Sequence, residues 1–333
     1  MRRITIVGAG AWGTALAMHG ARAGLGVTLF GRKDGTMDCL QATRTHAALR
    51  GAPPVPDAVE ITFEIAGAFD GAEAILWAVP VQATASELLR LVPALPASVP
   101  LVATSKGIEI GTHRRTTEII REVARRTDGI AVLSGPTFAA EVARGLPAAA
   151  VVASEDAALS TSLQGLLSSP TFRLYRSSDV VGVEISGAAK NVVAIAAGII
   201  DGLELGQNTR AALLTRALAE IRRLGTKLGG ATETFLGLAC AGDLILTATG
   251  DLSRNRRVGL ALARGSSVEE ALSSLGGEVA EGVPTATSLV ELARGVGVEM
   301  PIAEAIKSIL SGEMEPRAAV TRLMTRGLKD ERS

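Results

Sequence analysis

The sequence is poor in aromatic residues, and neither sign of charge dominates it. Only 3% of its 333 residues are aromatic, and 34 basic and 34 acidic residues give a net charge of zero. Nucleic-acid-binding surfaces rely on clustered positive charge and on aromatic side chains that stack on bases. The composition therefore argues against a nucleic-acid partner, and any bound anion must meet a local cluster of cations.

Cysteine and histidine are also scarce. The two cysteines, Cys39 and Cys240, show no paired Cys or His spacing, which argues against a zinc site and against a disulfide framework. We therefore expect no metal, and reduced thiols favour a cytoplasmic location. Only three histidines occur, so a lysine or a carboxylate is the expected proton carrier in any acid–base chemistry.

Long hydrophobic runs are absent as well. No apolar stretch reaches the roughly 18 residues that span a bilayer, and the nearest one is Val192–Ile200. Arg2 and Arg3 before an apolar stretch imitate the start of a secretory signal, but the glycines that follow suit a turn better than a signal core. We therefore expect no membrane insertion.

The first half of the chain alternates short apolar runs with helical patterns. A run without polar alternation is typical of a strand buried on both faces, as in a parallel sheet. Strands are expected at residues 4–7, 27–30, 74–79, 101–104, 130–133 and 149–153. Residues 14–22, between the first two strands, have a helical pattern. This repetition predicts an α/β fold with an N-terminal, Rossmann-type, doubly wound parallel sheet.

After about residue 180 the periodicity becomes helical. Helices are expected at residues 185–200, 209–228, 232–239, 258–263, 268–275, 285–294, 302–310 and 316–324. A chain of this length usually divides into two domains, because a single core stops growing before that size. We expect one domain, with the doubly wound sheet, over residues 1–180 and a second, all-helical domain over residues 181–333.

The segment Gly8-Ala9-Gly10-Ala11-Trp12-Gly13 has the glycine spacing of a dinucleotide-binding turn. It follows an expected strand and opens an expected helix, which would bring the backbone close to a pyrophosphate. This context favours an NAD(P) cofactor over a purely structural turn. NAD-selective sites place a carboxylate after the second strand, whereas here Arg32 and Lys33 stand there. Unless these cations are simply solvated they favour NADP(H), although Asp34 leaves NAD(H) open.

Two lysines are candidates for proton transfer. Lys106 follows an expected strand, at the end where open α/β sheets bind ligands, although a surface lysine would look the same. Lys190 is the only charged residue between Glu184 and Asp201, in a run of small and apolar residues. Burial would lower its pKa toward the range useful for an acid or base, unless the side chain reaches solvent at a helix edge.

A third group of candidates lies downstream. Ser253 suits a helix N-cap, which would place Arg254 and Asn255 in the first turn beside free backbone N–H groups. A cation there is unfavourable without an anion, so the group predicts a phosphate clamp rather than an exposed basic turn. Asp243 would either orient a lysine or cap a helix. Together the candidates predict hydride transfer to the carbonyl carbon of a small phosphorylated ketone. The domain over residues 1–180 is therefore expected to bind NAD(P), and the domain over residues 181–333 to be the substrate and catalytic domain.

Eight motifs occur in order along nearly the whole chain: Gly8–Ala17, Ser105–Glu109, Leu133–Ala139, Gly187–Asn191, Thr234–Leu238, Gly242–Leu244, Asp251–Arg257 and Glu281–Gly282. They closely resemble the motifs of bacterial-type NAD(P)-dependent glycerol-3-phosphate dehydrogenases. The resemblance implies reversible reduction of dihydroxyacetone phosphate to sn-glycerol 3-phosphate with NAD(P)H. It also implies that the product is used in glycerophospholipid synthesis. It also implies a homodimer and an all-α C-terminal domain like that of 6-phosphogluconate dehydrogenase.

The resemblance also implies roles for individual residues. Lys190 matches the proton donor or acceptor, assisted by Lys106 and Asp243. The expected substrate positions are Lys106, Gly135, Thr137, Lys190, Asp243, Ser253, Arg254 and Asn255. The expected cofactor positions are Gly8, Gly10, Ala11, Trp12, Gly13, Arg32, Lys33, Lys106, Ala139, Arg254, Val279 and Glu281.

The chain departs from the family pattern at two places. Ala11 stands where Ser is frequent, and Thr45–Gly51 lacks the usual Asn-Pro-x-Tyr-Leu-Pro stretch. The resemblance therefore implies no contact between this loop and the adenosine part of the cofactor.

Two other functions fit parts of the pattern. A dehydrogenase of non-phosphorylated β-hydroxy acids would share the two-domain plan, but its Arg254 and Asn255 would have no phosphate to bind. A catalytically silent dinucleotide-binding regulator would be expected to lack Lys190 or Asp243, and both are present.

Overall fold

The computed structural model describes residues 1–328 and 330–331. The last part of the expected second domain, residues 329 and 332–333, lies outside these described residues. An eight-stranded sheet forms the first part of the fold, in the order β3-β2-β1-β4-β5-β6-β7-β8. Its strands are β1 (Arg3–Val7), β2 (Gly26–Phe30), β3 (Val59–Thr62), β4 (Ala74–Trp77), β5 (Leu101–Ala103), β6 (Ile130–Ser134), β7 (Ala148–Ala153) and β8 (Phe172–Ser177).

The structure confirms all six expected strands to within two residues at each end, and it adds β3 and β8 at the two edges. The sheet is parallel as expected except at one pairing, where β7 runs antiparallel to β6. A parallel connection needs a crossover, usually a full helix, and only the five-residue α5 (Ala139–Ala143) lies between these two strands. The two missed strands have half-exposed or alternating burial, which gives a weak apolar signal.

Helices cover both faces of the sheet. They are α1 (Ala11–Arg22), α2 (Gly35–Thr43), α3 (Val81–Leu91), the 3₁₀ turn η1 (Val92–Ala94), α4 (Thr116–Val123), α5 and α6 (Ala157–Leu167). Neighbouring residues of one strand enter different cores: Leu76 packs with the cluster around α1, while Ile75 and Trp77 pack on the opposite face. The strands lack polar alternation because both of their faces are buried.

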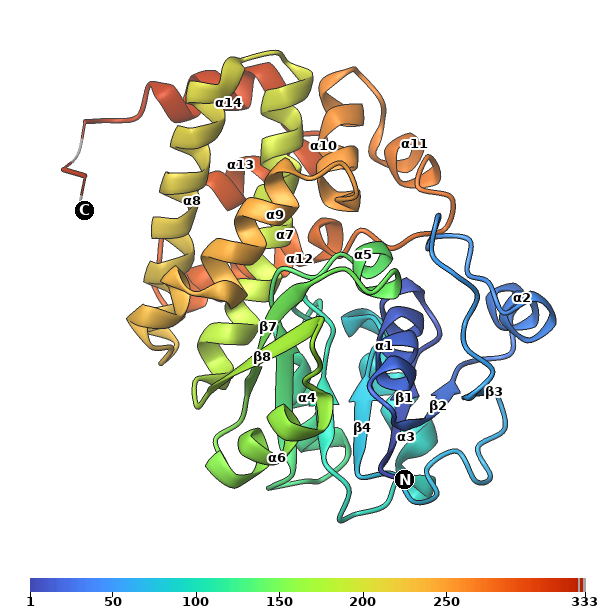
Figure 1. Ribbon diagram of the computed structural model, residues 1–333. Helices are drawn as coiled ribbons and strands as arrows, with labels where there is room; N and C mark the ends of the chain where they lie inside the picture. The colour runs from blue at the N-terminus through green and yellow to red at the C-terminus, as the bar shows by residue number, and fades with distance from the viewer. Residues whose placement is uncertain (329, 332–333) are drawn as a thin grey trace.

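The second part of the described chain is helical, and Figure 1 shows it stacked at one end of the sheet. It contains α7 (Val180–Gly202), α8 (Gly206–Lys227), the 3₁₀ turn η2 (Thr232–Leu236), the π-helical turn η3 (Leu238–Gly242), α9 (Asp243–Thr249), α10 (Arg254–Ala263), α11 (Val268–Ser273), α12 (Gly282–Gly295), α13 (Pro301–Leu310) and α14 (Pro316–Met324). The single helix expected at 232–239 was wrong, because Gly237 is extended and separates η2 from η3.

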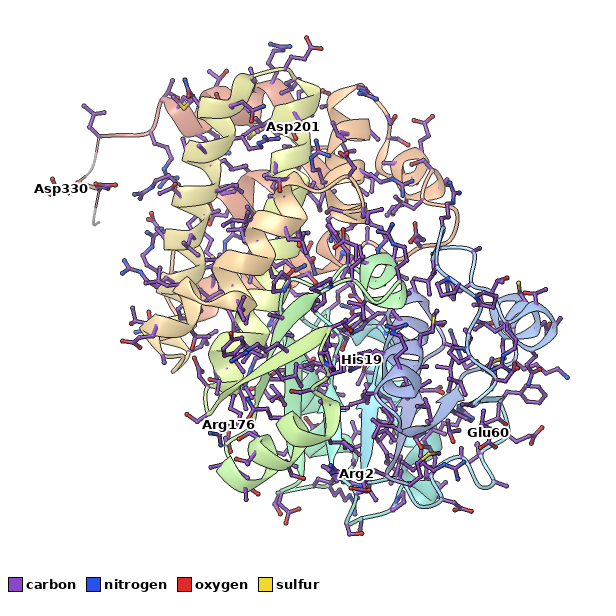
Figure 2. All side chains as sticks on the ribbon, viewed as in Figure 1. Arg2, His19, Glu60, Arg176, Asp201 and Asp330 are labelled. Atoms are coloured by element: carbon purple, nitrogen blue, oxygen red, sulfur yellow. The ribbon has the colours of Figure 1, made fainter. Side chains whose placement is uncertain are left out.

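Helix α7 is the central element of this part, and α10 crosses it closely. A Cβ on Gly198 would lie 2.0 Å from the Arg256 carbonyl oxygen, and a Cβ on Gly259 would lie 2.0 Å from that of Ile195. Asp201, labelled in Figure 2, accepts hydrogen bonds from Arg256 at 2.9 Å and from an α8 arginine. The close backbone contact at Gly198 and Gly259, together with the ion pair between Asp201 and Arg256, therefore holds the start of α10 against α7.

Among the described helices, α7 is long and apolar enough to span a membrane. A second candidate is the pair 232–249 and 254–263, if these two segments, bent by 46°, are counted as one span. This finding covers the described residues only. The apolar window of α7 is entirely buried within the protein, which is typical of the core helix of a globular protein.

Candidate active site

The glycine turn joins β1 to α1 as expected. Gly8 has φ +111°, and a Cβ there would lie 2.7 Å from the Ala78 carbonyl oxygen. A Cβ on Gly13 would lie 1.8 Å from the Gly8 carbonyl oxygen, whereas a Cβ on Gly10 would meet nothing within 4 Å. The fold itself therefore requires Gly8 and Gly13. Gly10 borders open space at the N-terminus of α1, which fits the close approach of a dinucleotide pyrophosphate.

The charged residues after β2 lie at the surface. Arg32 and Lys33 are exposed, and the Lys33 ammonium lies 5.1 Å from the centre of the Phe63 ring. Asp34 caps α2, because its Oδ1 accepts a hydrogen bond from the Met37 backbone N–H at 3.0 Å. One oxygen of the Asp34 carboxylate is thus engaged in capping α2, while the side chains of Arg32 and Lys33 stand exposed beside it.

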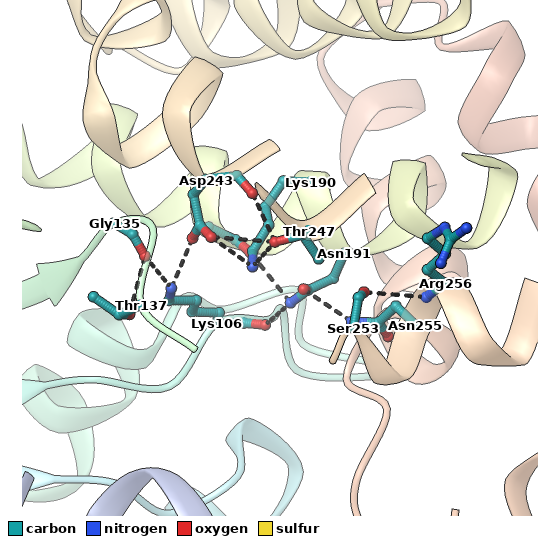
Figure 3. A network of polar contacts seen from close by, with 11 residues as sticks. Lys106, Gly135, Thr137, Lys190, Asn191, Asp243, Thr247, Ser253, Asn255 and Arg256 are labelled. Carbon is teal, nitrogen blue, oxygen red and sulfur yellow. Dashed lines mark hydrogen bonds and ion pairs between the residues drawn. The ribbon is translucent and has the colours of Figure 1, made fainter. Parts of the chain in front are cut away.

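The two candidate lysines meet on one carboxylate. Lys190 Nζ lies 3.0 Å from Asp243 Oδ1, and Lys106 Nζ lies 2.7 Å from Asp243 Oδ2 (Figure 3). Lys190 comes from the middle of α7, Lys106 from the loop after β5, and Asp243 from the first turn of α9. Lys106 also donates to the Gly135 carbonyl oxygen at 2.9 Å, and Thr137 donates to the same oxygen at 3.0 Å.

Burial controls the electrostatics of this group. Lys190 is 6% exposed, as expected for an apolar helix, and Asp243 is 1% exposed. Burial lowers the pKa of Lys190 to about 8; Asp243 opposes this shift and the positive charge of Lys106 adds to it. Burial by itself would raise the pKa of Asp243, but the two lysines outweigh it and hold that pKa below its usual value. Lys190 can therefore gain or lose a proton near neutral pH while Asp243 stays charged.

The predicted phosphate clamp has the expected helix start. Ser253 caps α10, because its Oγ accepts from the Arg256 N–H at 3.2 Å. Arg254 is partly exposed in the first turn and acts electrostatically on Lys190. Asn255 has an additional role that the sequence did not indicate. Its Oδ1 accepts from the Gly282 N–H at 2.9 Å, so it joins α10 to α12 and keeps one amide N–H for a ligand.

Three further expected cofactor positions lie on α5 and on the segment that leads into α12. Ala139 opens α5, and Val279 is 45% exposed on the segment before α12. Glu281 Oε2 is buried and has no hydrogen-bond partner among the described residues. Burial raises the pKa of Glu281 to about 7, and the Val81 backbone and Arg254 partly offset this rise. An unpartnered buried acceptor fits a ligand that brings a donor to it.

Two residues of the network were missed as site residues. Thr247 Oγ1 lies 2.7 Å from Lys190 Nζ, one helical turn beyond Asp243. Asn191 donates to the Lys106 carbonyl oxygen at 2.9 Å and accepts from Asn255 at 3.0 Å. Residues four apart lie on the same face of a helix, so the spacing of Asp243 and Thr247 could have indicated that they act together. This would have required a helix to be expected at residues 243–249, and the sequence pattern predicted none there.

No group of three or more His, Cys, Asp or Glu residues in the described part of the chain could hold a metal ion. The two lysines can polarise an oxygen atom placed between them and exchange a proton with it. The glycine turn lies at the end of the parallel strands, where open α/β sheets bind nucleotides.

A Rossmann sheet, a glycine turn and a buried lysine acid–base group define a nicotinamide-dependent dehydrogenase. Family models described as the N-terminus and the C-terminus of NAD-dependent glycerol-3-phosphate dehydrogenase match residues 3–160 and 179–321. The chain belongs to this family of glycerol-3-phosphate dehydrogenases, as its motifs suggested.

Full-length relatives agree with the family match. The chain is 49% identical over 328 residues to the glycerol-3-phosphate dehydrogenase [NAD(P)+] of Bradyrhizobium sp. (strain ORS 278), covering 98% of each chain. It is 47% identical to that of Geobacter sulfurreducens, covering 99% of each. The crystal structure of glycerol-3-phosphate dehydrogenase from Coxiella burnetii superposes with a TM-score of 0.92 at 38% identity, covering 98% of this chain and 99% of that one.

Proposed function

We propose that the protein reduces dihydroxyacetone phosphate to sn-glycerol 3-phosphate, reversibly and with NAD(P)H, and that this product supplies glycerophospholipid synthesis. The observation that carries this proposal is the buried pairing of Lys190 and Lys106 on Asp243, next to the clamp at the start of α10. The names of the full-length relatives support the same substrate.

When bound at the glycine turn, a nicotinamide cofactor would supply the hydride for the carbonyl carbon. Lys190 then acts as the acid: its Nζ donates a proton to the carbonyl oxygen, and in the reverse direction it accepts the hydroxyl proton. Asp243 holds Lys190 and Lys106 in place at 3.0 and 2.7 Å and keeps both ammonium groups directed at one point. Their combined charge stabilises the oxygen as negative charge develops on it.

The phosphate of the substrate is assigned to Arg254, the free N–H of Asn255 and the backbone N–H groups at the start of α10. Ser253, Gly135 and Thr137 complete the proposed substrate positions. A dehydrogenase of non-phosphorylated acids would offer no phosphate to the Arg254 guanidinium, which is partly exposed in the first turn of α10.

The cofactor is assigned to the glycine turn, with Ala11, Trp12, Ala139, Val279 and Glu281 around it. Arg32 and Lys33 support a preference for NADP(H), because a ribose 2′-phosphate would meet two exposed cations and the nearest carboxylate, Asp34, has one oxygen engaged in capping α2. We also propose a cytoplasmic homodimer without membrane insertion. Its two domains would divide at residue 180, where α7 begins.

The decisive test is the loss of absorbance from NADPH, and separately from NADH, when dihydroxyacetone phosphate is added to the purified protein. We expect turnover with both, faster with NADPH. A non-phosphorylated hydroxy-acid or keto-acid substrate serves as the comparison. Absence of turnover of dihydroxyacetone phosphate with either cofactor would refute the proposal.

Two variants separate chemistry from binding. Lys190→Ala should lower kcat by roughly 10²–10⁴-fold, because it removes the proton donor and part of the positive charge at the carbonyl oxygen. The Kd for NADPH should stay near wild type, because Lys190 is not one of the proposed cofactor positions. Arg254→Ala should instead raise the KM for dihydroxyacetone phosphate by at least about tenfold, since a charge-assisted hydrogen bond to phosphate is lost. An unchanged KM in Arg254→Ala would contradict the clamp.

A further inference from the structure

Helix α7, which carries Lys190, begins in the core on one face of the sheet and continues into the core of the helical part. Val183 packs in the same cluster as Ile119 of α4, whereas Ile185 packs with the helices that follow. Glu184 lies between these two residues of α7 and is 7% exposed. A buried carboxylate is unfavourable unless donors satisfy it, so its partners show what it is for.

The partners of Glu184 lie at the start of α4. Its Oε1 accepts from the Thr117 backbone N–H at 2.9 Å, and its Oε2 accepts from the Thr117 hydroxyl at 2.5 Å and from Arg115 Nη1 at 3.0 Å. The residue before α4 is Arg115, whose side chain does not accept from the free N–H groups of the first helical turn. A carboxylate of α7 therefore caps α4, at the helix end where the dipole favours negative charge.

Three donors thus meet the two oxygens of Glu184, which suits an ionised carboxylate because that group only accepts. Burial raises the pKa of Glu184; Arg115 and the two Thr117 donors oppose this rise, and Glu118 adds to it. A buried ion pair rarely stabilises a fold more than apolar side chains of similar volume would. The position that these bonds fix therefore explains them better than stability alone.

The chain that leads into α4 carries Lys106. The Ser105 hydroxyl bonds with the Thr116 hydroxyl at 3.0 Å, so the residue before Lys106 is tied to the capped turn of α4. The Lys106 carbonyl oxygen accepts from Asn191 Nδ2 at 2.9 Å, and a Cβ on Gly187 would lie 3.4 Å from Lys106 Cγ. Lys106 is thus held between the start of α4 and the face of α7.

The two lysines reach Asp243 from the two segments that Glu184 joins. Glu184 and Lys190 lie on the same helix, less than two turns apart. The ammonium groups of Lys106 and Lys190 lie 2.7 and 3.0 Å from different oxygens of Asp243. A shift of α4 against α7 would therefore change the separation of the two ammonium groups.

We propose that Glu184 is a positioning residue of the reaction: by capping α4 from α7 it sets where Lys106 stands relative to Lys190, and so holds both ammonium groups on Asp243. The inference rests on the proposed function, in that the two lysines act together on the substrate oxygen. Glu184 acts through α4 and takes no part in proton transfer itself.

The loss of this position should change the charge balance at Lys190 in one direction. Burial lowers the pKa of Lys190 to about 8; Asp243 opposes this shift, and Lys106 and Arg254 add to it. If Lys106 moves away, the pKa of Lys190 should rise. Lys190 must be protonated to act as an acid, so the pH above which kcat for reduction falls should rise with it.

Glu184→Gln tests the proposal, because it keeps the shape of the side chain and replaces one acceptor oxygen by an N–H donor. Arg115 keeps Glu118 as a partner at 2.6 Å, so the variant should fold. We expect kcat to fall about tenfold or more, since the charge of Lys106 is misplaced, and the fall of kcat to begin about half a pH unit higher or more. The Kd for NADPH should stay within about twofold of wild type, because the glycine turn is unchanged.

Glu118→Gln is the matched control. Glu118 pairs with the same arginine and accepts its backbone N–H at 2.8 Å, but it belongs to α4 itself. This variant should keep the wild-type kcat and pH profile. Thr117→Val removes only the hydroxyl bond to Glu184 and should move the pH profile in the same direction by a smaller amount. If Glu184→Gln does not fold, an unmoved profile in Thr117→Val overturns the proposal.

The pKa of Lys190 can also be measured without turnover, from the pH dependence of lysine side-chain ¹³C signals. Most of the 34 basic residues are arginines, so few lysine signals arise, and Lys190→Arg identifies the one that matters. Glu184→Gln should raise this pKa. A Glu184→Gln protein with a lowered melting temperature but wild-type kcat and an unchanged Lys190 pKa would overturn the proposal, as would an equal effect of Glu118→Gln. Absence of turnover in wild type would refute the proposed function instead, and the titration would still report on the position of Lys106.

Discussion

Asp243 is the residue on which the charges of the active site depend. It is 1% exposed and gives one carboxylate oxygen to each of two lysines. Its negative charge holds the pKa of Lys190 at about 8, above the value that burial and Lys106 alone would set. Asp243 therefore positions Lys190 and tunes its acidity without having to touch the reacting carbon.

Asp243→Asn should move the pH profile of reduction. Lys190 must be protonated to act as an acid, so wild-type kcat should be level below pH 8 and fall above it. Loss of the carboxylate lowers the pKa of Lys190, so the falling limb should shift to lower pH by about one unit or more, with kcat reduced roughly 10–100-fold at pH 7.5. Asp251→Asn, which changes an exposed carboxylate paired with Arg256, is the control. If kcat of Asp243→Asn falls at the same pH as that of wild type, this role of Asp243 is contradicted.

Gly10 and Gly13 should respond differently to the same substitution. Gly10→Ala meets no protein atom within 4 Å, so the melting temperature should stay near wild type, while the Kd for NADPH rises about tenfold or more. Gly13→Ala places a Cβ 1.8 Å from a backbone oxygen, so the protein itself should be destabilised. Thermal unfolding and fluorescence titration with NADPH measure the two effects. Tight NADPH binding by Gly10→Ala would show that the ligand does not approach this turn.

At the scale of elements, the close crossing of α7 and α10 joins the acid–base group to the phosphate clamp. Lys190 lies on α7, and the clamp occupies the first turn of α10. Gly198 and Gly259 allow the two backbones to approach, since either Cβ would lie 2.0 Å from a carbonyl oxygen of the other helix. The distance between the lysine and the substrate phosphate thus depends on two glycines outside the site.

Gly259→Ala should separate these helices. We expect a loss of about 1–3 kcal/mol in the free energy of unfolding and a raised KM for dihydroxyacetone phosphate, with a smaller change in the Kd for NADPH. Gly165→Ala in α6 is the control, because its Cβ meets nothing within 4 Å and alanine favours a helix. Denaturant unfolding and steady-state kinetics provide the measurements. If Gly259→Ala is destabilised but keeps the wild-type KM, the crossing of α7 and α10 does not set the position of the substrate phosphate.

For the whole molecule, buried carboxyls make stability depend on pH. Glu184, Glu220 and Glu281 all have raised pKa values, chiefly because of burial. Glu220 is far from the active site: it lies on α8 and accepts from the Ile302 N–H at the start of α13, at 3.0 and 3.1 Å. Its pKa rises from 4.5 to about 7.

Glu220→Gln should remove part of this dependence. Between pH 4.5 and 7 the folded state holds a proton at Glu220 that the unfolded state releases, so the free energy of unfolding falls as the pH rises through this range. At 1.36 kcal/mol per pKa unit, the difference between wild type and variant should change by up to about 3 kcal/mol from pH 4.5 to 8, in favour of the variant. Urea unfolding at several pH values measures it. If the free energies of unfolding of wild type and variant change with pH in the same way, the raised pKa of Glu220 is contradicted.

Local pattern by itself determined much of this protein. Apolar runs without alternation predicted the central strands because both faces of the sheet are buried, and the glycine spacing predicted the dinucleotide turn. The single charge of Lys190 in an apolar helix predicted its burial, which the structure confirms. These properties depend on neighbours within about one helical turn or one strand, so a linear pattern records them.

Only the tertiary structure decided the rest. The reversed direction of β7, the contact between Thr247 and Lys190, and the bonds between Thr117 and Glu184 all join residues far apart in the chain. Such contacts arise when separate elements pack, and no local periodicity encodes them. Asn255 illustrates the difference: its place in a helix start could be predicted, whereas its bonds to Asn191 and to the start of α12 required the packed fold.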